Sequence, residues 1–188
     1  MIYPEKIKAK KSDKIIKILM FVSACIAILL WVINKLTTPR IPWAALANGG
    51  IVYVWVIVIY SIRKNVNIAG HVLLQTIAIS LLTVYIDYIL SIKSGWSINI
   101  AIPIIIIIAN ITMAILTIVS YKKYIKYAIY QLIIVMLSML PAILMAEHIV
   151  PNNGLNISAI VVSVTNFVLC LIWCAKDVKD AVVRKLHW

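Results

Sequence analysis

Six long apolar stretches follow one another along the chain, separated by short polar segments. Each is close to the roughly 20 residues that a helix needs to cross the roughly 30 Å hydrocarbon layer of a bilayer. The stretches are residues 15–33, 43–62, 70–90, 97–119, 124–146 and 154–175. Residues 100–111 are rich in isoleucine, which favours strands in water, but in lipid a helix satisfies its own backbone groups. The pattern predicts an all-α membrane protein, a bundle of six transmembrane helices.

Composition agrees with this pattern and excludes two other classes of protein. Of the 188 residues, 64% are hydrophobic and 13% are charged, whereas soluble domains average about 45–50% apolar and about 25% charged residues. Disorder requires low hydrophobicity and high charge density, so it is excluded as well. We expect one transmembrane domain at 15–175, a basic segment at 1–14 and a basic tail at 176–188.

Lysine and arginine are distributed unevenly between the two sides that this topology defines. Fifteen of the 18 basic residues lie in or beside the N-terminal segment, the second and fourth connections and the tail. The positive-inside rule therefore predicts that both termini are cytoplasmic. The net charge of +12 follows from this topology. We thus expect attraction to anionic lipids of the inner leaflet and no nucleic-acid binding.

Asp87 is the acidic residue that lies clearly inside a predicted span. A carboxylate in a span is costly in lipid and is a functional-site hypothesis by default. It ends a polar stripe on one face of the third span, whose other members are His71, Gln75, Thr76, Ser80 and Thr83. The stripe is either a hydrated path for protons or ions or a set of packing groups. Asp87 itself lies near the outer end of its span, where Lys93 offers an ordinary ion-pair partner.

Two prolines interrupt predicted spans in the outer half of the membrane. Pro103 and Pro141 lack an N–H, so each frees a carbonyl, on Asn99 and Leu137 respectively, and is expected to kink its helix. The same half holds a group of polar or aromatic residues: Asp87, Trp96, Asn99, Glu147, His148 and Asn156. We interpret this group as a ligand site that opens outward; the alternative is an ordinary polar rim. Asp87, Glu147 and His148 have metal-binding donor types but no local ligand spacing, so we predict neither a metal nor a cofactor.

Other residues point to contacts between helices. Asn110 and Asn166 carry amides that lipid cannot satisfy, so they should face the bundle interior, either joining helices or lining a cavity. Small residues four apart let helix backbones approach closely, and the first two spans contain two such pairs: Ser23 with Ala27, and Ala45 with Gly49. We expect both pairs to lie at helix contacts.

Motifs of intramembrane or nucleotide-dependent catalysis are absent from the sequence. It contains no HExxH, no GxSxG, no Walker loop and no pair of aspartates in separate spans. We therefore predict that the protein is not an enzyme.

Several short strings together resemble a family of uncharacterised bacterial six-span membrane proteins. They are YPEKIKAK, INKLT with PW, IVYVW, YSI, N-I-x-G-H, IDY, GWS-x-N-x-AIP, YQL and the ending VRKLHW, and they extend over nearly the whole chain. Members of that family often carry an N-terminal zinc ribbon, which this chain lacks. The resemblance implies a six-helix unit of the bacterial cytoplasmic membrane. It also places a set of residues at motif positions: Trp43, Asp87, Gly95, Trp96, Asn99 and Pro103.

Two functions remain open at this point. The first is binding or transport of a small solute or ion through a pocket in the outer half of the bundle; in span count the chain is similar to the substrate-capture subunits of energy-coupling factor transporters. The second is a non-catalytic accessory, sensory or immunity-type subunit that acts through a membrane protein partner or a second copy of itself.

Overall fold

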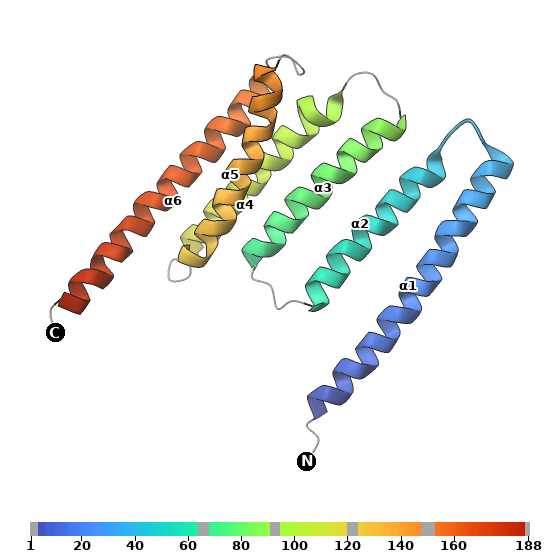
Figure 1. The fold of residues 1–188 in the computed structure, drawn as a ribbon, viewed down its shortest axis with the longest axis horizontal. Coiled ribbons are helices and arrows are strands. Elements are labelled where there is room, and N and C mark those ends of the chain that lie inside the picture. The colour runs from blue at the N-terminus through green and yellow to red at the C-terminus, as the bar shows by residue number, and fades with distance from the viewer. Residues whose placement is uncertain (1–3, 64–67, 91–94, 120–123, 148–152, 187–188) are drawn as a thin grey trace. The chain divides into compact units, whose positions relative to one another are not determined.

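The computed structural model describes residues 4–63, 68–90, 95–119, 124–147 and 153–186. All regular secondary structure in these residues is helical (Figure 1), which confirms the predicted all-α fold class. The elements are α1 (Pro4–Thr37), α2 (Trp43–Arg63), α3 (Ile68–Leu90), the short π-helix η1 (Ser97–Ala101), α4 (Ile102–Val119), α5 (Tyr124–Ala146) and α6 (Gly154–Leu186).

Five helical segments are long and apolar enough to cross a membrane. They are Lys14–Thr37, Trp43–Tyr60, Ile68–Leu90, Ser97–Val119 and Ile129–Ala146. The apolar part of α6 found within the described residues, Gly154–Leu169, is shorter than these five. The fold is therefore compatible with a multi-pass membrane protein, while the sixth span and the cytoplasmic position of the termini stay predictions.

The two terminal helices are longer than their predicted spans. Helix α1 begins at Pro4 instead of residue 15, and α6 continues to Leu186 instead of residue 175. Lysine, arginine, alanine and glutamate favour helices in water, and proline is well tolerated at a first helical position. Most of both basic segments is therefore a helical continuation of the adjoining span. Helix α1 also ends four residues beyond its predicted span, at Thr37, and the other helix ends agree with the predicted spans to within two residues.

Helix α4 buries two polar side chains on one face and exposes five isoleucines on the opposite face. Asn110 and Thr117 are buried, as are the other members of the same face: Pro103, Ile106, Ala109 and Met113. The opposite face exposes Ile104, Ile108, Ile111, Ile115 and Ile118. Such a continuous apolar surface is unusual for a soluble monomer. It is the distribution expected of a helix whose outer face contacts lipid.

The chain divides into two compact units, residues 1–59 and residues 60–188. In unit 1, α1 and α2 are joined by side-chain hydrogen bonds: Trp55 Nε1 donates to Ser23 Oγ at 2.7 Å, and Asn48 Nδ2 donates to the Ala27 carbonyl at 3.4 Å. Ser23 and Ala27 therefore lie on the face of α1 that contacts α2. On α2, Ala45 is buried and Gly49 is half-buried.

Asn34 organises the connection between α1 and α2. Its Nδ2 donates to the carbonyls of Thr38 and Ile41, both at 2.8 Å, and its Oδ1 accepts the Ala44 N–H at 3.1 Å. The Asn34 side chain is buried, and it satisfies backbone groups that the two helix ends leave open. This polar residue, which the sequence pattern placed in a loop, thus fixes the turn of the hairpin.

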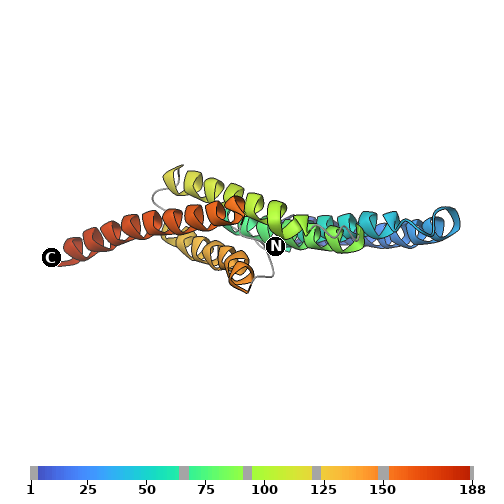
Figure 2. The same ribbon diagram turned by 90° about the horizontal axis from the view of Figure 1, so that it is seen from above.

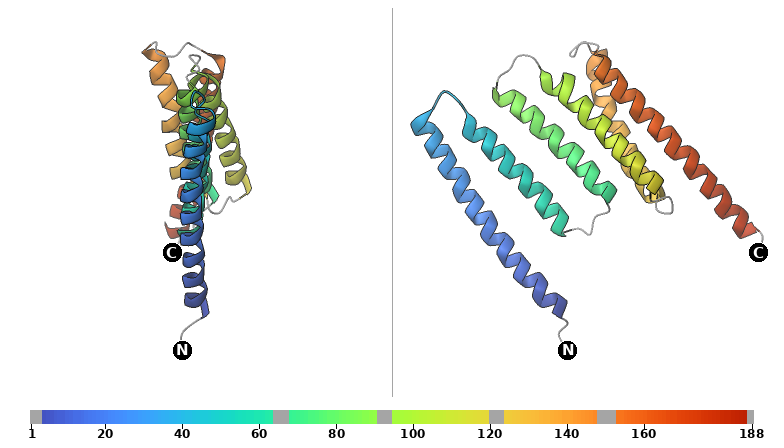
Figure 3. Two further views of the ribbon diagram at one scale, coloured as in Figure 1. Left: turned by 90° about the vertical axis from the view of Figure 1, so that its right-hand side faces the viewer. Right: turned by 180° about the vertical axis from the view of Figure 1, so that it is seen from behind.

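In unit 2, α4 contacts α3, α5 and α6, and α5 also contacts α6 (Figure 2). A small hydrophobic cluster of Ala69, Ala109, Met113 and Ile134 joins α3, α4 and α5. Helices α3 and α5 finish at the same end of this unit as η1 and α6 begin (Figures 1 and 3). We call this end of unit 2 the η1 end.

Candidate functional site

Asn110 lies at the centre of a hydrogen-bond network between three helices. Its Nδ2 donates to Ser163 Oγ on α6 at 2.7 Å and to the Ile106 carbonyl of its own helix at 2.9 Å. Its Oδ1 accepts from Gln131 Nε2 on α5 at 2.8 Å. Asn110 is fully buried. Its amide therefore needs these protein partners in place of the water molecules that would bond to it at the surface.

Asn166 completes this network from α6. Its Nδ2 donates to the Asn110 carbonyl at 2.8 Å, with a longer contact to Asn110 Oδ1 at 3.4 Å. Of the two interpretations of these amides, the geometry corresponds to the one in which they join helices. Gln131 and Ser163 are the partners that tie α5 and α6 to Asn110. Asn110 and Asn166 are therefore not brought together with Asp87.

The polar groups of the η1 end are arranged differently. Asp87, on the last turn of α3, accepts two hydrogen bonds on Oδ2, from Ser97 Oγ at 2.6 Å and from Ser97 N at 3.2 Å. Its other oxygen, Oδ1, is buried and has no hydrogen-bond partner among the described residues. Lys93, the ion-pair partner considered above, lies outside those residues. One carboxylate oxygen therefore fixes η1 against α3, and the other is left to accept a hydrogen bond.

Trp96 immediately precedes η1 and presents a second unused group. Its indole Nε1 is buried without a partner in the described part of the chain. Gly95, just before it, has a φ of +55°, a backbone conformation that glycine adopts without strain. The Gly95 carbonyl then accepts the N–H groups of Ile98 and Asn99, at 3.2 and 3.1 Å. This turn aligns the start of η1, whose first residue, Ser97, directly follows Trp96.

On the other flank of η1, α6 supplies amides. Asn153 Nδ2 donates to the carbonyl of Asn99 at 3.1 Å, four residues before Pro103, which has no N–H to donate. Asn153 Oδ1 also accepts the Leu155 N–H at 3.4 Å, as a helix N-cap residue does. Asn156, in the first turn of α6, is 0% exposed. Neither polar atom of its amide finds a partner among the residues described.

The remaining acidic candidate is exposed at the η1 end, and the histidine is not among the described residues. Glu147 is exposed just beyond the end of α5, and His148 lies outside the described residues. Within the described ranges, no group of three His, Cys, Asp or Glu side chains is placed to hold a metal ion. Pro141 lies inside α5, which continues through it, and it lines a cavity between α3, η1, α4 and α5.

Two hydroxyls of the polar stripe of α3 are bonded to carbonyls of their own helix. Thr76 Oγ1 donates to the Val72 carbonyl at 2.8 Å, and Thr83 Oγ1 to the Ser80 carbonyl at 2.9 Å. His71, Gln75 and Thr76 line a mainly apolar hollow of about 300 Å³ between α3 and α4. The two threonine hydroxyls thus bond within their own helix. The Ser80 hydroxyl, by contrast, has no hydrogen-bond partner among the described residues.

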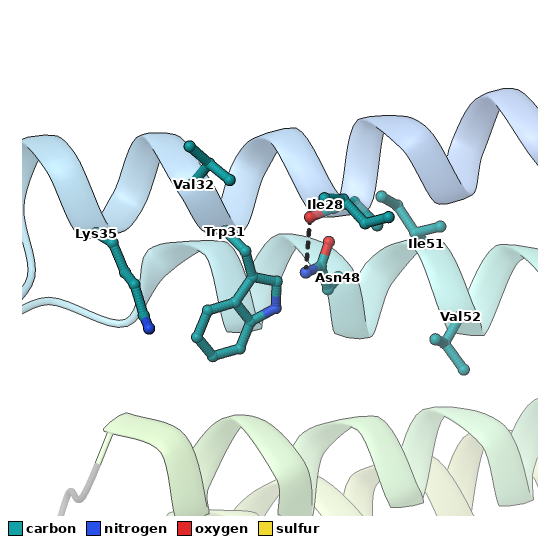
Figure 4. Close-up of a pocket in the computed structure, with 8 residues that line it drawn as sticks. Ile28, Trp31, Val32, Lys35, Asn48, Ile51 and Val52 are labelled. Atoms are coloured by element: carbon teal, nitrogen blue, oxygen red, sulfur yellow. Dashed lines mark hydrogen bonds between the residues drawn. The ribbon is translucent and has the colours of Figure 1, made fainter.

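Unit 1 carries a separate hollow of about 560 Å³ on α1 and α2. Figure 4 shows Asn48 at the contact between the helices, with Trp31 and Lys35 farther along α1 toward its C-terminal end. Asn48 Oδ1 is buried without a partner among the described residues. This hollow combines an apolar surface with one amide oxygen and one lysine.

Sequence reasoning missed three residues that organise these sites. Ser97 and Asn153 hold η1 from its two flanks, and Gln131 ties α5 to Asn110. Asn153 had a local signal, since an asparagine directly before a helix is a preferred N-cap residue. Ser97 and Gln131 had none, because their partners lie 10 and 21 residues away.

Comparison with known proteins gives one result. A family of unknown function, DUF6320, matches residues 3–188. The chain belongs to this family. Membership of DUF6320 confirms the resemblance to an uncharacterised family over nearly the whole chain, while a bacterial origin and zinc-ribbon relatives stay predictions. No match was found among curated proteins or among solved structures.

Proposed function

We propose that this DUF6320 protein is a six-span protein of the bacterial cytoplasmic membrane, with both termini in the cytoplasm. Its η1 end then lies in the outer half of the bilayer, and it binds a small solute there that donates at least one hydrogen bond, for transport or sensing. Five helices of membrane-spanning length and composition support the placement. The uneven distribution of basic residues supports the orientation. We further propose that it is not an enzyme and that anionic lipids surround its cytoplasmic ends.

The observation that carries the binding proposal is the buried, unpartnered Oδ1 of Asp87. Leaving a polar atom buried and unpaired costs about 1–3 kcal/mol, and more for a charged group. An oxygen that another protein donor does not satisfy is therefore a natural acceptor for a bound molecule. Trp96, the residue before Ser97 in the chain, has an unused donor in its Nε1, and we propose that the solute carries an acceptor as well as a donor.

The charge of the pair favours a cationic or neutral solute over an anionic one. Asp87 offers a carboxyl oxygen, Oδ1, to which no basic side chain of the described residues donates. An ammonium group would supply the missing donor and also offset the carboxylate. Trp96 adds an aromatic ring, which interacts favourably with cations. We accordingly propose a small amine or another compact hydrogen-bond donor.

The test compares two acidic residues near the same end of unit 2. Protein purified in mild detergent is titrated with methylammonium, ethanolamine and glycine, and binding is followed by isothermal calorimetry. We expect saturable binding of at least one amine, a loss of ten-fold or more in affinity in Asp87→Asn, and little change in Glu147→Gln, which alters an exposed acid. If none of the three probes binds wild type, or if both variants bind like wild type, the proposal is wrong.

A second candidate function is that of an accessory subunit that binds a membrane protein partner. The hollow of about 560 Å³ on unit 1 favours it, because Asn48 Oδ1 is left unpaired there beside an apolar surface. Purification in mild detergent tests this candidate directly. A stoichiometric partner that is retained by wild type and lost in Asn48→Leu supports it, and repeated recovery of the chain alone contradicts it.

A further inference from the structure

A second site lies inside unit 2, between α3, η1, α4 and α5. These elements enclose a cavity of about 320 Å³, and nine of its ten lining residues are apolar. Ser80 and Pro141 are buried, whereas Leu81, Val84 and Leu140 are exposed. The cavity therefore has a buried floor and an exposed rim. Its volume is at the lower end of the range of about 300–1,000 Å³ that small-molecule sites occupy.

The hydroxyl of Ser80 is the polar group of this cavity. Ser80 is 9% exposed, and its Oγ has no hydrogen-bond partner among the described residues. Other hydroxyls of unit 2 donate to a carbonyl of their own helix; they include Thr76, Thr83, Thr112, Thr117, Ser138 and Ser163. Ser80 is thus a buried donor that the protein does not use, at the edge of a space large enough for a ligand.

The depth of Ser80 restricts the kind of ligand. Ser80 lies about 15–18 Å from either end of α3 at about 1.5 Å per residue, so in a bilayer of roughly 30 Å hydrocarbon thickness it lies near the midplane. The ester and phosphate oxygens of a phospholipid lie at the interface, too far away to reach it. An acyl chain alone would fill the cavity without satisfying the hydroxyl.

We propose that this cavity binds a neutral, lipid-soluble molecule that carries a hydrogen-bonding oxygen on an apolar body, as a quinone does. The ligand enters from the lipid past Val84 and Leu140, its apolar part fills the cavity, and its oxygen accepts the Ser80 hydroxyl. This inference rests on the membrane placement proposed above, but not on solute binding at Asp87.

The probes are decylubiquinone and decylbenzene, which share a decyl chain on a six-membered ring, and of which the quinone alone carries hydrogen-bonding oxygens. Each is added to the purified full-length protein in mild detergent, and bound molecules are counted by native mass spectrometry. We expect wild type to retain one decylubiquinone per chain and to bind decylbenzene at least threefold more weakly. Equal retention of both probes, or of neither, overturns the proposal.

Two variants locate the site. Ser80→Ala is expected to lower decylubiquinone affinity about three- to tenfold, the effect of losing one neutral hydrogen bond, and to leave decylbenzene unchanged. Val84→Phe, at the exposed rim, is expected to block both probes. The matched controls are Ser138→Ala, whose hydroxyl donates to the Val135 carbonyl of its own helix, and Ile115→Phe, on the exposed face of α4. Both controls should bind like wild type.

Two further outcomes separate the alternatives. Retention of a phospholipid that Val84→Phe removes and Ser80→Ala does not affect would assign the cavity to an acyl chain and overturn the proposal. Asp87→Asn should bind decylubiquinone normally, whereas amine binding should be normal in Ser80→Ala. Failure of the amine site therefore leaves this inference intact, and the reverse also holds.

Discussion

Asn153 donates a hydrogen bond through Nδ2 to the backbone carbonyl of Asn99 at 3.1 Å. Pro103, four residues after Asn99, has no N–H to offer this carbonyl, so an asparagine 54 residues away supplies the donor. The same residue caps α6 through its Oδ1. The Asn153 side chain thus bonds to the first turn of α6 and to a carbonyl of η1. These two bonds hold α6 against η1.

Replacement of Asn153 should therefore destabilise the protein. We expect Asn153→Ala to lower the free energy of unfolding by about 1–3 kcal/mol, because it removes the helix cap and the hydrogen bond from Asn153 Nδ2 to the Asn99 carbonyl. The measurement is unfolding by denaturant in mixed micelles, followed by circular dichroism. Asn153→Asp is the matched variant: it keeps the cap but loses the donor, so it should fall between the alanine variant and wild type.

The origin of this effect in Pro103 is testable by a double-mutant cycle. Pro103→Ala restores an N–H that can reach the backbone carbonyls of η1. The cost of Asn153→Ala should then be smaller in the Pro103→Ala background than in wild type, by about 0.5–1 kcal/mol. Equal costs in the two backgrounds would show that Asn153 acts through the cap alone.

The Asn110 network should be the most sensitive polar element of unit 2. Asn110→Ala removes the acceptor of Gln131 Nε2 and the donor to Ser163 Oγ, so we expect a loss of about 1–3 kcal/mol in the free energy of unfolding. Thr112→Val, two residues along α4, is the control, because Thr112 Oγ1 donates to the Ile108 carbonyl of its own helix. A loss in Asn110→Ala no larger than in the control would contradict the role of the network.

The orientation is testable in intact cells. In a variant whose three cysteines are replaced by serine, single cysteines are introduced at Arg40, Glu147 or Lys14, all of which are exposed. A membrane-impermeant maleimide should label positions 40 and 147 from outside, and should label position 14 only after lysis. Labelling of position 14 in intact cells, or failure to label position 40, would contradict the predicted topology.

The helices were predictable from the sequence because long apolar runs have one stable structure in lipid. The bounds of the fifth helix, 124–146, and of the segment 97–119 agree with the prediction at both ends. The π-helix at Ser97–Ala101 was not predicted. Its hydrogen bonds join residues five apart, as in the bond from the Ile102 N–H to the Ser97 carbonyl, and no apolar periodicity indicates such a bond.

The polar contacts were predictable only in part, for a related reason. Burial depth indicated that Asn110 and Asn166 need partners and that Pro103 frees the Asn99 carbonyl. It did not indicate which residues supply the partners, because Ser163 and Asn153 approach through the packing of α6 against α4 and η1. The unpaired Asp87 Oδ1 and Ser80 Oγ likewise follow from tertiary arrangement.

The central claim, that the η1 end holds a solute, is tested most directly by an experimental density map of the protein in lipid nanodiscs with millimolar methylammonium or ethanolamine. We predict non-protein density larger than a single water molecule within hydrogen-bonding distance of Asp87 Oδ1 or Trp96 Nε1. A map in which both atoms are bonded to protein groups, or contact no more than single waters, would contradict the account.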